Sequence, residues 1–374
     1  MKLSFGMVFL VFGTATAMNR ILDFLSDDVI TQVNNAQRLW RAGRNFSPNT
    51  SMSQLFDLIG TEMNAFTMLW NVPKFSDPKW PPDQNVPEFF DARQRWPNCT
   101  VIGEILDQSK CGSCWAVSPA QIATDRYCIA SNGRHNIRLS GQEILGCTLA
   151  RFHQGCSGGV PTDALKFIRR NGLVSGGDHG SDDGCIPYFM PKCAHHGAGP
   201  LTPCEKVKRL VPECDLSCTN PSYKKSFEED VRRFSTMYRV ASVERWIMRD
   251  IMTYGPLSTQ FKVFPDFFLY KSGVYEPITP SFLNGSTTRV PISARTPTSL
   301  RGHALKIIGW GTESGVPYWL GVNSWNEHWG EKGIVKLKRQ SSLINVEEWM
   351  LGILPAVEPK FYKNQTPKNI YRTN

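Results

Sequence analysis

The residues best able to do chemistry lie around Cys114, in the run Asp107-Gln108-Ser109-Lys110-Cys111-Gly112-Ser113-Cys114-Trp115-Ala116. Small residues precede Cys114, and a helix-compatible stretch, residues 115–123, follows it. This order predicts a sulfur at a helix N-terminus, where backbone N–H groups and the helix dipole favour the thiolate. Because the thiolate is the nucleophilic form of cysteine, the segment indicates covalent catalysis by Cys114.

A thiolate nucleophile needs an imidazole partner, and the imidazole needs a group that orients it. His303 stands in Arg301-Gly302-His303-Ala304-Leu305, just before an apolar stretch that predicts a strand. Val322-Asn323-Ser324-Trp325 supplies an amide beside an indole. A lone histidine is usually structural, but here three chemically matched blocks occur together.

The cysteine count agrees with one free thiol. All 11 cysteines lie between Cys99 and Cys218, and an odd number leaves at least one unpaired in an oxidising compartment. Cys114 is the best candidate for that thiol. The spacings do not repeat as paired C-x₂-C units, so we expect no zinc site.

The first 17 residues have the form of a secretory signal peptide: a basic start, an apolar stretch from Leu3 to Phe12, and the small-residue ending Ala15-Thr16-Ala17. No stretch is long enough to span a bilayer, so we expect no stable membrane insertion. The secretory pathway follows, with the lysosome or extracellular space as destination. Sequons make candidate glycosylation sites of Asn45, Asn49, Asn284 and Asn364, with Asn98 weakest because Cys99 is its middle residue.

Residues 18–85 contain no cysteine and read as a separate segment. Asp27 or Asp28 is expected to cap a helix carrying Ile30, Val33 and Trp40. The proline-rich stretch 74–87 predicts an extended, exposed and cleavable linker. Later in the chain, residues 307–310 and 335–337 predict buried strands.

Two further segments predict surface structure. Residues 276–302, rich in Ser, Thr and Pro with Arg289, Arg295 and Arg301, predict a long surface loop, and residues 356–374 a polar tail. The three arginines would suit acidic substrates or a partner, although a solvated loop is the simpler reading.

Composition excludes several classes of protein. The 374 residues are 41% hydrophobic and 20% charged, which is typical of a globular chain and excludes global disorder. The net charge of +9 would suit an acidic partner. There is no run of five like charges and no nucleic-acid-binding motif, so we expect no nucleic-acid partner.

These blocks together resemble the papain-like cysteine peptidases, and within them the cathepsin B group. The resemblance rests on residues 25–28 with 40–46, 86–93, 111–115, 156–159, 302–304 and 323–325, and it covers nearly all of the chain. It implies an α+β, two-lobed fold with a cleft between a helical and a β-rich lobe. It also implies a propeptide over 18–85 and a peptidase domain over 86–374. It implies no metal or other cofactor.

The resemblance assigns roles to residues. Cys114 would be the nucleophile and His303 the acid/base, with Asn323 orienting the imidazole and Gln108 donating to the oxyanion. Trp325 would shield the His303–Asn323 bond. Substrate backbone would pair at three glycines, Gly158, Gly159 and Gly302.

The resemblance also implies five disulfides: Cys99–Cys128, Cys111–Cys156, Cys147–Cys214, Cys185–Cys218 and Cys193–Cys204. A sixth bridge usual in cathepsin B is absent, because Thr148 and Phe152 stand at its two ends.

An occluding-loop segment, residues 185–218, is implied around His195 and His196. Those imidazoles would face the C-terminal carboxylate of a substrate, and Asp107 would tie His195 down. A second tie looks lost, because Leu201 and His328 occupy its positions. An exposed ion pair is worth only ~0–1 kcal/mol, so we expect the loop still to close, but less tightly. We also expect more endopeptidase character than in typical cathepsin B.

Three positions near the site raise separate questions. Glu348 aligns with the base of the second specificity pocket, although the neighbouring Glu347 leaves the register open by one residue. Pro119 falls early in the helix that follows Cys114 and is expected to strain it. Lys110 replaces a small residue near the nucleophile.

The expected function is therefore a cysteine peptidase made as a zymogen, with both endopeptidase and carboxydipeptidase activity. Its partners would be peptide and protein substrates, its own propeptide and possible cystatin-type inhibitors, and it would be a monomer. The alternative is a weak or inactive matrix-binding protein similar to the tubulointerstitial nephritis antigens. Cys114, His303, Asn323 and Gln108 all stand, and no cysteine-rich module occupies residues 1–98, so the peptidase is favoured.

Overall fold

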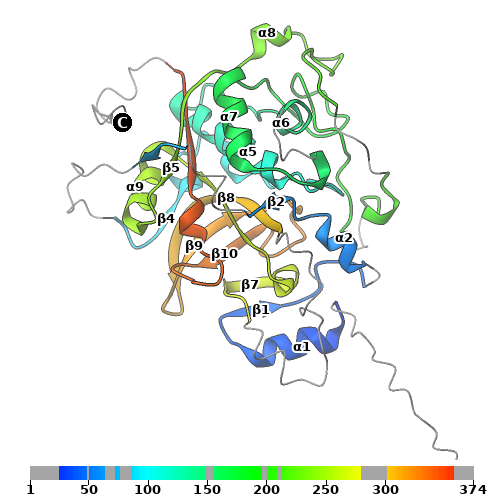
Figure 1. Cartoon of the computed structure of the whole chain (residues 1–374), viewed down its shortest axis with the longest axis vertical. Helices are drawn as coiled ribbons and strands as arrows, with labels where there is room; N and C mark the ends of the chain where they lie inside the picture. Colours follow the sequence, from blue (N-terminus) through cyan, green and yellow to red (C-terminus); the bar gives the residue numbers. More distant parts are fainter. Residues whose placement is uncertain are drawn as a thin grey trace, which may run out of the picture.

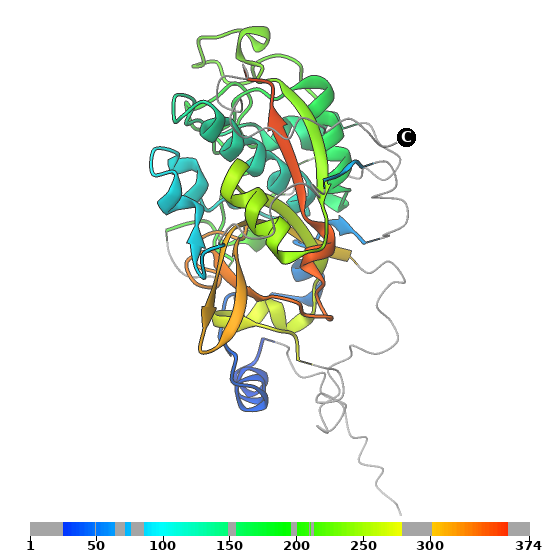
Figure 2. The same cartoon turned by 90° about the vertical axis from the view of Figure 1, so that its left-hand side faces the viewer.

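A computed structural model describes residues 25–48, 50–63, 72–75, 86–148, 155–195, 200–208, 210, 213–278 and 301–357. The helices between residues 114 and 171 gather in one half of the molecule and most strands in the other (Figure 1). Seen from the side, the N-terminal helix lies beyond the strands, at the end farthest from the helical half (Figure 2). The expected α+β, two-lobed architecture is confirmed.

Among the described residues the helices are α1 (Asp27–Ala36), α2 (Met52–Phe56), α4 (Ala92–Arg95), α5 (Cys114–Ala130), α6 (Gly141–Cys147), α7 (Pro161–Asn171), α8 (Phe227–Asp230) and α9 (Glu244–Tyr254). The strands are β1 (Trp40–Ala42), β2 (Thr61–Glu62), β3 (Lys74–Phe75), β4 (Phe90–Asp91), β5 (Phe234–Val240), β6 (Leu257–Lys262), β7 (Tyr270–Tyr275), β8 (Arg301–Glu313), β9 (Val316–Val322), β10 (Ile334–Lys338) and β11 (Leu351–Pro355).

The helical half is built around α5. This helix is buried along most of its length and packs against α6, α7, β8 and β11. Its apolar residues share one core with Leu139, Ile144 and Leu165. The helix continues through Pro119 as one element, because close packing of its neighbours holds the turn that lacks a backbone donor. Cys114 is its first residue.

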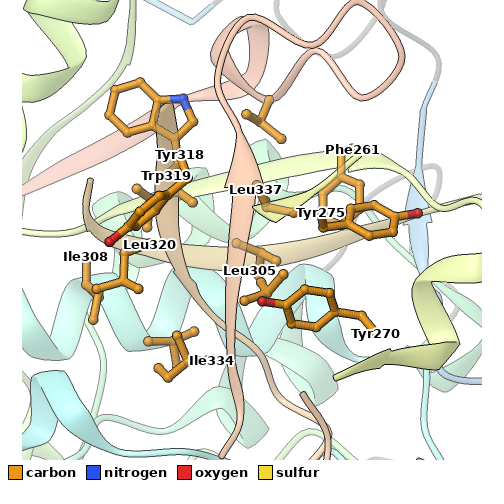
Figure 3. Close-up of a cluster of buried hydrophobic side chains, with 14 of the residues drawn as sticks. Phe261, Tyr270, Tyr275, Leu305, Ile308, Tyr318, Trp319, Leu320, Ile334 and Leu337 are labelled. Atoms are coloured by element: carbon orange, nitrogen blue, oxygen red, sulfur yellow. The ribbon is translucent and has the colours of Figure 1, made fainter. Parts of the chain in front are cut away.

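The strand half is a sheet in the order β1-β7-β10-β9-β8-β6-β11-β5-β3, with β2 and β4 added to β8. The 13-residue β8 is the long element, and it pairs antiparallel with β6 and β9. Side chains from β6 to β10 gather in one buried cluster (Figure 3): Phe261, Tyr270, Tyr275, Leu305, Ile308, Tyr318, Trp319, Leu320, Ile334 and Leu337. Both predicted strands, 307–310 and 335–337, lie within β8 and β10.

The expected N-terminal helix needs correction at two points. Helix α1 is capped by Ser26, whose side chain accepts from Val29 N, whereas Asp27 and Asp28 lie in the first turn. Trp40 belongs to strand β1 and not to the helix, because β1 pairs with β7 and the indole packs on Tyr275.

The expected linker and loop also begin differently. Residues 74 and 75 form β3, which pairs with β5 and buries Phe75, while residues 76–85 lie outside the described part of the chain. Arg301 and Gly302 open β8, so His303 lies inside that strand and not before it. The rest of the expected surface loop, 279–300, and the tail from 358 lie outside the described residues.

Five disulfides join the pairs that the resemblance implied: Cys99–Cys128, Cys111–Cys156, Cys147–Cys214, Cys185–Cys218 and Cys193–Cys204. Cys114 is the one free cysteine and is buried. In the described part of the chain no helix is long and apolar enough to cross a bilayer. Residues 1–24, which hold the expected signal peptide, lie outside it.

Candidate active site

Three side chains from distant parts of the sequence meet where the two halves join. Cys114 is the first residue of α5, His303 projects from β8, and Asn323 directly follows β9. Asn323 Oδ1 accepts from His303 Nε2 at 2.6 Å and from Ser324 N at 2.8 Å. Since a backbone N–H can only donate, the second bond fixes which end of the amide faces the ring. His303 Nδ1 is therefore the ring nitrogen left to share a proton with Cys114.

The surroundings of Cys114 favour its thiolate. Burial alone would raise the pKa of the thiol, but the charge and hydrogen bonding of His303 oppose it, and the Thr61 hydroxyl adds to their effect. Together these groups bring the pKa of Cys114 down to about 7 from its usual 9.0. A nucleophile with that pKa is substantially ionised near neutral pH.

Trp325 covers the imidazole. Its ring centroid lies 4.5 Å from that of His303, and its other face stacks on Phe268 at 5.3 Å. Trp325 and His303 are both fully buried. This burial leaves little room for water at the His303–Asn323 hydrogen bond.

Gln108 is held by three hydrogen bonds in the region of Cys114. Its Oε1 accepts from Ser324 Oγ at 2.6 Å, which leaves both amide protons to donate. Nε2 donates to Cys111 O at 2.7 Å and to Leu58 O at 2.8 Å. Gln108 is therefore aimed at a carbonyl oxygen beside Cys114, and a residue of the N-terminal segment supplies that oxygen.

The N-terminal segment crosses the site as an extended strand. In β2, Thr61 pairs with Gly302 of β8 on one side and bridges to Gly159 on the other. Gly159 N donates to Gly60 O at 2.8 Å, and Glu62 N donates to Gly159 O at 3.1 Å. Figure 1 shows β2 between the helical half and the strands. Gly158 precedes Gly159 with φ of 131°, a backbone conformation that suits glycine.

Two residues that the sequence did not single out touch the sulfur itself. Gly60 N lies 3.4 Å and Thr61 Oγ1 3.3 Å from Cys114 Sγ. A Cβ on Gly60 would fall 1.8 Å from Gly112 O, so only glycine permits this approach. In the sequence, only the adjacent glycine and threonine at positions 60 and 61 could have pointed to this contact with Cys114.

Met63, two residues further on, marks a second contact region. Its side chain packs against Val160 and Trp349, and a Cβ on Gly302 would lie 2.3 Å from its sulfur. An apolar side chain thus fits beside Gly302.

The structure distinguishes the two neighbouring glutamates, Glu347 and Glu348, by their burial. Glu347 is buried and accepts from Trp319 Nε1 and Gln340 N, both at 2.8 Å. Glu348 is exposed beside Trp349. Of the two carboxylates, Glu348 is thus the one available to a ligand.

The occluding-loop segment is fastened beside Gln108. His195 Nε2 lies 3.0 Å from Asp107 Oδ1, and Asp107 Oδ2 accepts from Cys193 N at 3.0 Å. Burial alone would raise the pKa of Asp107, but His195 and the backbone donors hold it below its usual 3.8. His195 is itself buried, with Phe46 edge-on at 5.9 Å and Ser47 N donating to its carbonyl oxygen. His196 lies outside the described residues.

The structure contradicts one glycosylation candidate. Asn45 is 1% exposed, and its amide nitrogen donates to Phe268 O at 2.9 Å and Tyr270 O at 2.7 Å. Both amide protons are used, so a glycan on this nitrogen is incompatible with the fold. Asn49, Asn284 and Asn364 lie outside the described residues.

Within the described part of the chain one group could be mistaken for a metal site. Cys193, His195 and Cys204 bring three possible ligand atoms within 4.8 Å of one another. Cys193 and Cys204 are joined in a disulfide, however, and His195 is bonded to Asp107. The arrangement does not fit a metal ion, because a disulfide sulfur is not a thiolate ligand.

Family models match both parts of the chain. One described as papain family cysteine protease matches residues 86–352, and one described as peptidase family C1 propeptide matches residues 25–65.

Similar proteins agree with those matches. A "Cathepsin B-like cysteine proteinase" of Schistosoma japonicum is 36% identical over 342 residues, covering 91% of this chain and 93% of that protein. "Cathepsin B-like cysteine proteinase 4" of Caenorhabditis elegans is 38% identical and covers 74% of this chain and 77% of its own length. Among solved structures, "proCathepsin B S9 from Trypanosoma congolense" matches with a TM-score of 0.69 and 27% identity, over 90% of this chain and all of that one.

Proposed function

The chain belongs to the papain family of cysteine proteases, and on that basis we propose that Cys114 and His303 hydrolyse peptide bonds as a thiolate–imidazolium pair. It is a cathepsin B-like cysteine peptidase with a propeptide. The finer assignments below concern its catalytic residues, its cleavage mode and its maturation.

The proposed chemistry is acyl transfer in two steps. Cys114 Sγ attacks the scissile carbonyl, and the oxyanion receives hydrogen bonds from Gln108 Nε2 and the Cys114 backbone N–H. His303 then gives its proton to the leaving amine, and the acyl-enzyme forms. Water, deprotonated by His303, releases the acyl group. One such oxyanion donor is worth roughly 3–4 kcal/mol in other enzymes, because it stabilises charge that exists only in the transition state.

The observation that carries this proposal is an extended backbone lying over Cys114 in the protein itself. Residues 60–62 hydrogen-bond to Gly159 and pair with Gly302, while Leu58 O accepts from the Gln108 amide. A substrate peptide of the same extended form would meet the nucleophile, the oxyanion donor and the imidazole together. The propeptide occupies this place in the zymogen and must leave before a substrate enters.

We assign both endopeptidase and carboxydipeptidase activity to the mature enzyme. The Asp107–His195 bond supports an occluding-loop segment that closes one end of the cleft. Leu201 and His328 cannot form the second ion pair, so the segment keeps one of the two ion pairs expected to tie it down, and longer substrates gain access. The exposed Glu348, next to an apolar contact region, suits basic as well as apolar side chains.

For maturation we propose removal of residues 1–17 as a signal peptide and of 18–85 as the propeptide. The mature domain would then begin at 86, reside in the lysosome or outside the cell, and act as a monomer. Cystatin-type inhibitors are expected partners, because they use the same cleft.

Mass spectrometry of a defined peptide with a free C-terminus tests the proposal. Protein matured in acid is expected to release C-terminal dipeptides and to make some internal cuts, and Cys114→Ala protein to make neither. If the wild-type protein leaves the peptide intact after confirmed removal of the propeptide, the peptidase assignment is wrong. The matrix-binding alternative then takes its place.

A further inference from the structure

We propose that Lys110 binds a substrate carboxylate on the leaving-group side of the cleft, and that the departing propeptide uncovers this site. The proposal rests on the peptidase function above and names a residue that helps to choose the substrate. It is separate from the role expected of His195 and His196.

The site is a cavity shared by the propeptide and the mature domain. Phe46, Thr50, Gln54 and Leu58 form the propeptide wall, and Lys110, His195, Cys204 and Glu205 form the other. The cavity is partly open and has a volume of about 30 Å³, enough for about one water molecule but for no larger ligand. Once the propeptide leaves, its four side chains go with it, and the wall that bears Lys110 opens to the cleft.

The order of contacts along the propeptide shows which side of the nucleophile this wall occupies. Phe46 packs on His195, Leu58 O meets Gln108, and Thr61 meets Cys114. Met63 then lies on the opposite side, against Trp349. Lys110 therefore stands on the His195 side of Cys114, the side that we assign to the leaving group.

Lys110 is mounted on a rigid turn. The preceding Ser109 has φ of 54°, and its backbone N donates to Asp107 Oδ1 at 2.7 Å. The following Cys111 is in a disulfide with Cys156. A charged group on such a support loses less conformational freedom when it binds a ligand.

The charges around Lys110 leave it available to an anion. Asp107 is already matched by His195, at 3.0 Å. Lys110 is half-buried, and within the described part of the chain its ammonium makes no hydrogen bond or ion pair. Apart from His195, which is bound to Asp107, Glu205 is the other ionisable side chain that lines the mature wall of this cavity beside Lys110, and it is exposed. Glu205 would compete with a ligand carboxylate for Lys110.

Binding to a protein that cannot turn over tests the proposal without relying on catalysis. Cys114→Ala protein, freed of its propeptide by an added protease, is titrated with one fluorescent peptide carrying either a C-terminal carboxylate or an amide. We expect Lys110→Gln to lower the preference for the carboxylate form about fivefold, the size of effect of a part-exposed ion pair. Lys110→Arg should keep the preference, and Glu205→Gln should increase it.

A second peptide pair separates the two sources of a carboxylate. Amidated peptides ending in Glu or Gln differ only in a side-chain charge. If Lys110→Gln lowers the preference for Glu over Gln, then Lys110 binds an acidic side chain of the substrate. If it lowers the preference for the free carboxylate over the amide, then Lys110 binds the C-terminus of the substrate.

Lys206 is an exposed lysine next to Glu205 in the occluding-loop segment. Lys206→Gln is the matched control and should change neither of the two peptide preferences. If Lys110→Gln leaves both preferences as in the parent protein, the inference is wrong, whereas absence of peptide hydrolysis in the wild-type protein would refute only the proposed function.

Discussion

For single residues, the structure of the zymogen places Cys114 in surroundings that favour its thiolate. Gly60 N and Thr61 Oγ1 both reach Cys114 Sγ, and donors to sulfur stabilise the thiolate. Inhibition in this structure thus comes from covering the sulfur and not from removing its charge. The propeptide therefore supplies part of the electrostatic environment of the Cys114 sulfur in the zymogen.

Replacing Thr61 by Val in the zymogen should raise the pKa of Cys114, because the change removes only the hydroxyl. A hydrogen bond to a charged group contributes about 1.5–3 kcal/mol, so the titration midpoint should move up by about one to two pH units. Thiolate absorbance near 240 nm, followed against pH, measures it. Thr50→Val, a propeptide threonine on the cavity wall, is the control, and an unmoved midpoint in Thr61→Val would contradict the role of the hydroxyl.

At the scale of elements, the propeptide is fastened at points well apart from β2. Asn45 bonds to the carbonyls of residues 268 and 270, next to and within β7. Phe46 is 1% exposed and lies among His195, Phe268 and Trp325. The occluding-loop segment and the propeptide are therefore in contact while the Asp107–His195 bond is intact. The two elements support each other in the zymogen.

Truncating Phe46 should loosen this anchor. A buried Phe→Ala change costs about 3–5 kcal/mol, so opening of the propeptide should become at least about 100-fold more frequent. The rate at which a small thiol reagent labels Cys114 in the intact zymogen at neutral pH reports opening, because Cys114 is the one free cysteine and is buried.

The chain offers a matched control in Phe56, at the end of α2, which is 38% exposed. Phe56→Ala should change the labelling rate less than about twofold, as expected for a surface position. Equal rates for the two variants would show that Phe46 is not an anchor.

At the scale of the whole molecule, buried carboxyl groups make stability depend on pH. Burial raises the pKa of Glu143 to about 7, against the opposing effect of Val174 N–H. Burial likewise raises the pKa values of Asp125 and Asp266 to about 6, although Lys306 opposes it at Asp125. Between pH 4.5 and 7 the folded protein keeps protons that the unfolded chain releases. The stabilisation is therefore full below the ordinary pKa and is lost as pH rises through the folded one.

Glu143→Gln should flatten this dependence. The shift of Glu143 corresponds to about 3 kcal/mol of stability lost between pH 4.5 and 7.5, as an order of magnitude, and a neutral amide cannot lose it. Urea unfolding of Cys114→Ala protein at the two pH values, with and without the second change, measures the difference. The exposed Glu228→Gln is the control, and a pH dependence in Glu143→Gln as steep as in the parent protein would rule out Glu143 as its source.

Features that depend on neighbouring residues, or on whether the number of cysteines is odd, could be predicted from the sequence alone. Small residues before Cys114 and a helix-forming run after it predicted the N-terminal position on α5. An odd number of cysteines predicted one free thiol, and the blocks around His303 and Asn323 predicted the family. Each of these signals lies within a few residues or follows from a count, so no knowledge of distant contacts was needed.

Contacts between residues far apart in the sequence could not be predicted in this way. Thr61 and Gly60 meet Cys114 because β2 is paired with β8, and Asn45 is buried because its segment packs against β7. Trp40 follows a helical pattern but lies in a strand, since pairing with β7 outweighs local propensity. Lys110 lines a cavity together with His195, which lies 85 residues away in the chain, and the role that we propose for Lys110 depends on that cavity. Such contacts are set by strand pairing and core packing, and these depend on the whole chain at once.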